Sequence, residues 1–168
     1  MDTASAAPTD APRRFSGPVA LRDALLGALL QATEAGVPRI ECIDADFAAW
    51  PLDDARLLRS LTAWARGPQR RLFMLAREFD DVARRHPRFA VWRRQFAHAV
   101  ECRAASELDR SEFPTLLLAG DVGLQAGAGP RFAGRWLDED ADRRTWRGVV
   151  EAITQRSEAA FPAHPLGL

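Results

Sequence analysis

The chain has 168 residues, 47% of them hydrophobic, which is enough to bury one core and is typical of a single domain. Its 23 basic residues, all of them arginine, balance 23 acidic residues, so the zero net charge gives no overall attraction to nucleic acid or to an anionic membrane. The absence of lysine excludes Schiff-base chemistry, a lysine general base and the lysine of a nucleotide-binding P-loop.

Small polar residues and prolines at the start of the chain predict a flexible tail over residues 1–17, without the apolar run of a signal peptide. One α/β domain is expected over residues 18–162, followed by a short tail over 163–168. No apolar run has the length of a membrane span, so we expect a cytoplasmic protein with no membrane partner. Cys42 and Cys102 form no CxxC pair, and we expect both to be buried and reduced.

The first half of the domain has the order helix, strand, helix, strand. Apolar residues at helical spacing predict an amphipathic helix over residues 18–35, and "RIECIDAD" (39–46) predicts a buried strand. The run "PLDDARLLRSLTAWARG" (51–67) predicts a helix with Asp53 as its N-cap, and "RRLFMLA" (70–76) predicts an interior strand. A helix between two strands indicates a crossover connection with parallel pairing.

The second half of the domain predicts more strands and a long final helix. Residues 78–98 predict a helix that breaks before Pro87, because proline disfavours helical geometry in the residue that precedes it. The predicted strands are "AVECRAAS" (99–106), the hairpin "PTLLLAGDVGLQAG" (114–127) with its turn at Gly120–Asp121, and a last edge strand "RFAGRWLD" (131–138). Residues 138–161 predict a helix. The expected fold is α/β, with a mixed sheet, parallel first strands, an antiparallel hairpin and helices on both faces.

In this order the segments resemble the phospholipase D-like fold, and more narrowly an uncharacterised bacterial domain family that is similar to this fold without its active site. The segments that carry the resemblance are "IECIDADFAAWPLDD", "RRLFMLAREFDDVARRHP", "FPTLLLAGDVG", "RFAGRW" and "AITQRSEAAFP". Active members have a His-x-Lys-x4-Asp signature on the hairpin, in which histidine is the nucleophile and lysine binds the phosphate. With Asp121 as the aspartate, Pro114 and Leu116 stand in place of these groups. Neither side chain can attack phosphorus or neutralise a phosphoryl oxygen, so the resemblance implies a fold without this activity.

An arginine-rich segment, "ARRHPRFAVWRRQF" (83–96), is the first candidate site. Its arginines, which are candidates for binding an anion, are Arg84, Arg85, Arg88, Arg93 and Arg94. Guanidinium groups interleaved with Phe89, Trp92 and Phe96 can hold phosphates or stack on single-stranded bases. The alternative is a buried aromatic stripe with a solvated arginine face, and the helical spacing of the three aromatic residues favours it.

Acidic residues at the end of the first predicted strand are the second candidate site. Asp44 and Asp46 lie where open parallel sheets place their ligands, and Asp53 and Asp54 follow closely. The alternative, which we favour, is that the first pair shapes the loop and the second pair caps the next helix. No metal and no cofactor are expected, because no histidine stands at zinc-ligand spacing; the three histidines are His86, His98 and His164.

These observations predict a non-catalytic accessory or interaction module whose partner is another protein or a second copy of the chain. Two alternatives remain open: a binder of anions or nucleic acid that uses the arginine-rich segment, and a divergent hydrolase that uses the acids after the first strand. Nucleic acid is not the partner we favour, because a neutral chain lacks the usual basic footprint.

Overall fold

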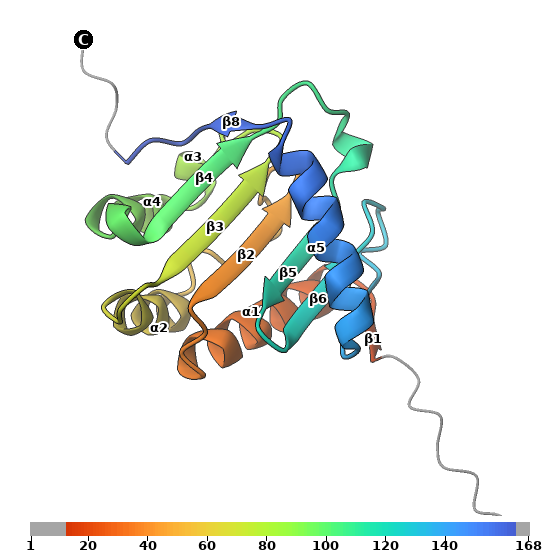
Figure 1. Cartoon of the computed structure of the whole chain (residues 1–168), viewed down its shortest axis with the longest axis horizontal. Helices are drawn as coiled ribbons and strands as arrows, with labels where there is room; N and C mark the ends of the chain where they lie inside the picture. The colour runs from red at the N-terminus through yellow and green to blue at the C-terminus, as the bar shows by residue number, and fades with distance from the viewer. Residues whose placement is uncertain (1–12, 164–168) are drawn as a thin grey trace, which may run out of the picture.

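A mixed sheet of eight strands runs through the computed structural model, which describes residues 13–163 (Figure 1). The strands are β1 Arg14–Phe15, β2 Arg39–Asp44, β3 Arg71–Ala76, β4 Val100–Ala104, β5 Thr115–Ala119, β6 Val122–Ala126, β7 Gly134–Trp136 and β8 Glu158–Ala159. The helices are α1 Pro18–Glu34, α2 Ala55–Ala65, α3 Val82–Arg85, α4 Pro87–Gln95 and α5 Asp140–Thr154, with 3₁₀-helices η1 Ala97–Ala99 and η2 Arg110–Glu112. The strand order is β1-β7-β6-β5-β2-β3-β4-β8.

The centre of the sheet combines parallel and antiparallel pairing. β2, β3 and β4 are parallel neighbours, joined by crossovers that contain α2 and then α3 and α4. β5 pairs antiparallel with β2, so that Ile43 lies opposite Leu116, and β5 and β6 form the hairpin. The hairpin turns at Gly120, whose positive φ of 59° suits glycine at the first position of a tight turn. The predicted mixed sheet with parallel first strands and an antiparallel hairpin is confirmed.

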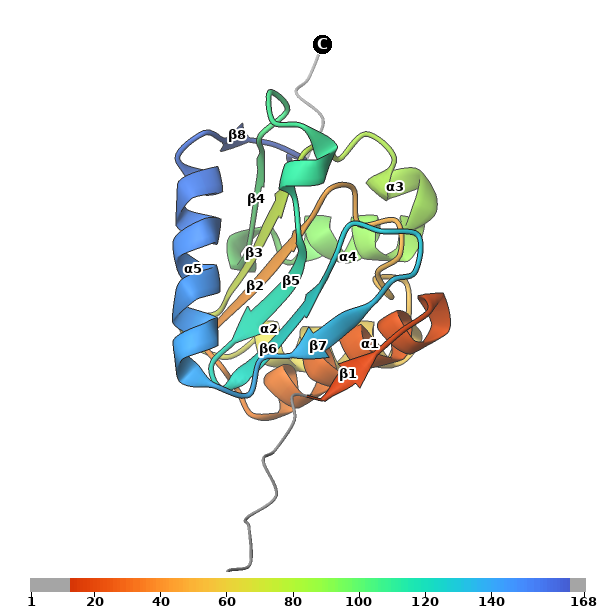
Figure 2. The ribbon, with the colours of Figure 1, turned by 90° about the vertical axis from the view of Figure 1, so that its right-hand side faces the viewer.

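Helices cover both faces of the sheet, as predicted (Figure 2). α1, α2 and α4 lie against one face, and α5 lies alone against the other. Side chains alternate along β2, because successive residues of a strand point to opposite faces. Ile40 and Cys42 therefore join the core under α1 and α2, whereas Ile43 joins the core under α5.

The two cysteines lie in one row across three strands. Cys42 on β2 and Cys102 on β4 flank Met74 on β3 in register, and both thiols are buried and unpaired. Burial raises the pKa of both thiols, that of Cys102 to about 12. The predicted burial of both residues is confirmed.

The N-terminal edge of the sheet differs from the prediction. Arg14–Phe15, within the range 1–17 assigned to a tail, form β1 and pair with β7, so the segment 131–138 does not supply the edge strand. The amide of Trp136 donates to the carbonyl of Arg13 at 2.9 Å, and the guanidinium of Arg13 lies 4.6 Å from the centroid of the Trp136 ring. Residues 1–12 and 164–168 of the two predicted tails lie outside the described residues.

The C-terminal helix is also shorter than predicted. α5 ends at Thr154, and the chain turns at Ser157 into β8, which pairs antiparallel with β4. Arg103 on β4 holds this turn, because its guanidinium donates to the hydroxyl and the carbonyl of Ser157, both at 2.7 Å. A contact between residues so far apart leaves no local signal in the sequence. None of the helices within 13–163 has both the length and the apolar composition of a membrane span.

Candidate ligand-binding site

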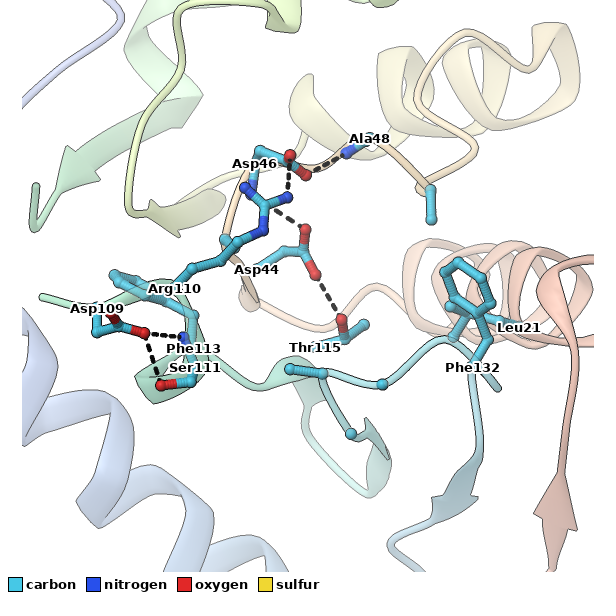
Figure 3. Close-up of a pocket in the computed structure, with 15 residues that line it drawn as sticks. Leu21, Asp44, Asp46, Ala48, Asp109, Arg110, Ser111, Phe113, Thr115 and Phe132 are labelled. Carbon is cyan, nitrogen blue, oxygen red and sulfur yellow. Dashed lines mark hydrogen bonds and ion pairs between the residues drawn. The ribbon is translucent and has the colours of Figure 1, made fainter.

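A cavity of 680 Å³ opens where β2 ends and β5 begins (Figure 3). Figure 3 shows Asp44 near its middle, Arg110 of η2 on one side, and Phe132 of the β6–β7 loop beside Leu21 of α1 on the other. The glycine-rich segment 127–129 of the β6–β7 loop closes part of the rim. The cavity therefore combines charged groups, an aromatic ring and small residues at the carboxyl end of a central parallel strand, the usual ligand position in an open α/β sheet.

Asp44 is held at the bottom of this cavity by three hydrogen bonds. Its Oδ1 accepts from the Thr115 hydroxyl at the start of β5, and its Oδ2 accepts from the backbone amides of Asp46 (3.2 Å) and Phe47 (2.8 Å). The antiparallel pairing brings Asp44 and Thr115 together, because Ile43 lies opposite Leu116, Asp44 follows Ile43 and Thr115 precedes Leu116. Burial raises the pKa of the Asp44 carboxyl, although the three hydrogen bonds lower it.

Asp46 lies on the wall of the cavity between two arginines. It accepts a short hydrogen bond from Arg110 and one at 3.0 Å from the amide of Ala48, and Arg85 of α3 lies 3.6 Å away. Burial opposes ionisation of Asp46, but the hydrogen bonds from Arg110 and Ala48 and the charges of both arginines lower the pKa of its carboxyl. Asp46 is thus ionised, and the positive charges of Arg110 and Arg85 balance its negative charge.

The loop after β2 is fixed in an unusual conformation. Phe47 is fully buried and has a positive φ of 58°, a backbone conformation that costs a non-glycine residue free energy. Its ring packs on Trp50 (5.1 Å between centroids) and Phe79 (5.9 Å), and its carbonyl lies 2.9 Å from Nε2 of His86. These contacts hold the loop in place, so the Asp44 and Asp46 side chains are presented on a rigid segment.

The acidic cluster has mainly the structural roles that we favoured from the sequence. Asp54, not Asp53, is the N-cap of α2, with its Oδ1 accepting from the amides of Arg56 (2.9 Å) and Leu57 (3.3 Å). The prediction that Asp53 is this N-cap is wrong, because its Oδ1 instead accepts from the amide of Phe89 in the first turn of α4, at 3.0 Å. Asp53 therefore links the start of one helix to the start of another.

The positions that the resemblance aligns with a catalytic histidine and lysine, Pro114 and Leu116, do not line the cavity, although Pro114 stands between the lining residues Phe113 and Thr115. Leu116 is fully buried and packs in the core under α5, on the opposite face of β5 from Thr115. Pro114 is half-buried just before the strand. Asp121 is exposed in the hairpin turn, at the other end of β5 from Thr115. The three positions do not form a polar cluster.

The five candidate arginines do not form one surface. Arg84 pairs with Asp81 at 3.0 Å, and Arg85 pairs with Asp46 and, at 3.7 Å, with Asp81. Arg88 and Arg94 are exposed and make no ion pair with the described residues, whereas Arg93 is only 7% exposed. Of the five candidates, aspartates therefore neutralise two and one is buried, which leaves Arg88 and Arg94 as exposed arginines without an ion pair among the described residues.

The aromatic residues of the same segment are core residues, as the favoured alternative predicted. Phe89 and Trp92 are buried and stack at 5.7 Å between centroids, and Trp92 stacks on Phe96 at 5.1 Å. The indole N–H of Trp92 donates to the hydroxyl of Thr62 at 3.1 Å. These rings are not available for stacking on bases.

Histidine supplies no metal site in the part of the chain that the structure describes. His86 is buried and its Nε2 is satisfied by the carbonyl of Phe47, and His98 is exposed. His164 lies outside the described residues. Within 13–163 no group of three or more histidine, cysteine, aspartate or glutamate side chains has the arrangement of a metal site.

Comparison with known proteins finds a solved structure of similar fold but no matching family. No protein-family model and no curated protein matches the chain. Among solved structures it is similar to the archaeal chromatin protein TrmBL2, with a TM-score of 0.61 over 94% of this chain. The chain shares the fold of part of TrmBL2. The match spans 57% of the TrmBL2 chain at 12% identity, so it shows the fold alone; TrmBL2 itself is described as having a novel mode of DNA binding.

Arg110, Thr115 and Phe132 are among the cavity residues that were not predicted as site residues from the sequence. The segment "DRSE" (109–112) carried a local signal, since it forms a capping box in which Asp109 accepts from the amide of Ser111 at 2.8 Å. That signal predicts the start of a helical turn, but not that Arg110 meets Asp46. Only the strand pairing of β2 with β5 brings these groups together.

Proposed function

We propose that the chain is a non-catalytic binding module with a phospholipase D-like fold, and that the cavity at the end of β2 binds a small molecule. The observation that most supports this is that Leu116, which stands in place of the phosphate-binding lysine, lies on the other face of the sheet from the polar groups of the cavity. Asp44, Arg110 and Thr115 line an open cavity, whereas Leu116 lies in the core on the other face. The residues that line this cavity include no histidine, cysteine or lysine, so it offers groups for binding without the nucleophile and the phosphate-binding lysine of the phospholipase D-like signature.

The charges of the cavity indicate the class of ligand. Three carboxylates, those of Asp44, Asp46 and Asp109, line it together with one guanidinium, that of Arg110. This excess of hydrogen-bond acceptors disfavours phosphates and favours a ligand that donates hydrogen bonds through amine or hydroxyl groups. Leu21 and Phe132 offer an apolar wall for its carbon skeleton. The proposed ligand is therefore a small cationic or polyhydroxylated molecule.

Three four-carbon probes test this ligand class. We expect 1,4-diaminobutane or 1,4-butanediol to shift the NMR amide signals of Asp46, Ser111 and Gly129, and succinate to leave them unchanged, because the cavity repels a second set of carboxylates. Asp44→Asn is expected to weaken diaminobutane binding by about tenfold, the loss of one charge-assisted contact. The matched control is Asp121→Asn in the exposed turn, which should bind as the wild type does. Stronger binding of succinate would contradict the proposal.

The proposed lack of catalysis has its own test. Hydrolysis of bis(p-nitrophenyl) phosphate is expected at the rate of buffer alone, for the wild type and for Asp121→Ala, since neither a histidine nor a lysine stands beside that carboxylate. Release of p-nitrophenolate is followed by absorbance. Turnover that is present in the wild type and absent in Asp121→Ala would show that the chain is an enzyme.

DNA binding is a second candidate, supported by the shared fold with TrmBL2, a protein described as binding DNA. Arg88 and Arg94 are the exposed members of the arginine-rich segment without an ion pair among the described residues. If they contact phosphates, fluorescence anisotropy of a labelled duplex should show binding that weakens with salt, and Arg88→Ala/Arg94→Ala should lower the slope of log K against log salt by about 2. Arg84→Ala is the control, because Asp81 already neutralises Arg84. Absence of binding at low salt would exclude this candidate.

Self-association, or binding to another protein, stays a prediction from the sequence.

A further inference from the structure

Arg93 is a buried cation without a counter-ion among the described residues. It lies in the last turn of α4 and is only 7% exposed. Its Nη2 donates to the carbonyl of Phe161 at 3.4 Å, while its Nε and Nη1 are buried and have no oxygen acceptor among the described residues. A guanidinium keeps its charge in any protein environment, so burial does not neutralise it. An unpaired buried charge is unfavourable, and proteins normally pair such groups with an anion.

The neighbouring thiol does not supply the missing negative charge. Arg93 lies beside Cys102 of β4, and both its charge and a side-chain hydrogen bond from it lower the pKa of that thiol. Burial dominates, however, and raises the pKa of Cys102 to about 12, so the thiol is neutral at physiological pH. The Phe161 carbonyl is a dipole and not a charge. The charge of the Arg93 guanidinium is therefore not balanced by any anion within residues 13–163.

A second cavity lies against this residue. It has a volume of 340 Å³ and is lined by Arg93 and Arg94 together with Ala83 of α3, Ala90 of α4 and the segment 161–163 after β8. It shares no lining residue with the cavity at the end of β2. Arg94 is exposed and makes no ion pair with the described residues, so two adjacent guanidinium groups stand at one small cavity.

We propose that this second cavity is a binding site for a small organic carboxylate, held by Arg93 and Arg94. A carboxylate matches the planar fork of a guanidinium with two parallel hydrogen bonds. Apart from the arginines, the lining consists of alanine, phenylalanine and proline, and offers no hydroxyl, amide or lysine side chain for the additional oxygens and charge of a phosphate dianion. An apolar body of a few carbons suits these walls, and the volume is at the low end for ligand cavities.

This site is independent of the function proposed above, since the two cavities have different walls and opposite charge. The first cavity has an excess of acids and the second has only basic charged groups. Failure of one proposal therefore leaves the other intact.

Butyrate and its uncharged analogue butyramide test the proposal by NMR. Butyrate is expected to shift the Arg93 Nε–H signal and the amide signals of Ala90, Arg94 and Phe161, while butyramide is expected to leave them in place. Arg94→Ala should weaken butyrate binding by about tenfold, since one charge-assisted contact is lost. Arg84→Ala, an exposed arginine of the neighbouring α3, should bind as the wild type does.

Two further measurements complete the test. Arg93→Met should abolish butyrate binding and have a melting temperature no lower than that of the wild type without ligand, because an apolar side chain of similar length replaces an unpaired charge. If Arg93→Met does not fold, the inference is overturned, because the guanidinium is then satisfied within the domain. Equal shifts with butyrate and butyramide, or no shift with either, also overturn it. Tighter binding of inorganic phosphate than of butyrate would show that the ligand class is wrong.

Discussion

Leu116→Lys is expected to lower the free energy of unfolding by more than about 4 kcal/mol, enough to unfold a large fraction of a typical domain. Leu116 is fully buried between strands and α5, in a core that includes Ile43, Val150 and Ile153. Lysine at this position would bury an ammonium group, and no aspartate or glutamate is among the fully buried residues of the described chain. The residue that a phospholipase D-like enzyme needs is thus one that this core does not accept.

Chemical denaturation followed by tryptophan fluorescence measures this effect. The control is Asp121→Lys, which places the same charge in the exposed turn of the same hairpin and should change stability by no more than about 0.5 kcal/mol. The double variant Pro114→His/Leu116→Lys should neither fold normally nor hydrolyse a phosphodiester. A stable Leu116→Lys variant that hydrolyses a phosphodiester would contradict the proposed loss of function.

Asp44→Ala is expected to cost about 3 kcal/mol of stability, because it leaves the Thr115 hydroxyl and two backbone amides without their acceptor. Asp44→Asn is the matched variant: its amide oxygen can accept from both backbone amides and its NH₂ group can donate to Thr115, so we expect a loss within about 1 kcal/mol. Thermal denaturation of the three proteins compares them. Equal stability of Asp44→Ala and the wild type would show that these hydrogen bonds contribute nothing.

The stability of the wild type relative to Asp44→Asn is expected to change with pH in one direction. Burial raises the pKa of Asp44 in the folded state, so the folded state binds this proton more tightly than the unfolded state does. This tighter proton binding stabilises the folded state fully when the pH is below the pKa of Asp44 in the unfolded chain, about 3.9. The stabilisation is lost as the pH rises through the higher pKa of Asp44 in the folded state. Relative to Asp44→Asn, the wild type should therefore lose stability as the pH rises from about 4 toward neutrality. Asp46 has a lowered pKa and acts in the opposite direction, but it is present in both proteins and cancels in the comparison.

Local sequence patterns were sufficient to predict most of the fold. The alternation of Ile40, Cys42 and Ile43 placed β2 and its two faces, and Gly120 placed the hairpin turn, because each depends on backbone geometry within a few residues. Pro87 separated α3 from α4 for the same reason. For these three features, which depend on neighbours along the chain, the pattern and the structure agree.

The candidate sites depend on contacts between distant residues, and here the sequence was less informative. Arg110 donates a hydrogen bond to Asp46, which lies 64 residues earlier in the sequence, and no local pattern in either segment predicts this contact. Arg93 and Arg94 are neighbours on one helix, yet only the first is buried, since the chain around Phe161 returns across α4 after β8. Periodicity indicated which face of α4 holds the aromatic residues, but not that a later segment covers an arginine beside them.

Both ends of the sheet, finally, limit how this protein associates with another chain. Its outermost strands, Arg14–Phe15 and Glu158–Ala159, are each two residues long. Edge strands this short leave few backbone groups with which an added strand could pair, and natural sheets use short edge strands to avoid edge-to-edge aggregation. A dimer or a complex that joins sheets into a continuous ladder is therefore disfavoured. Any partner has to recognise side chains on the helices and loops.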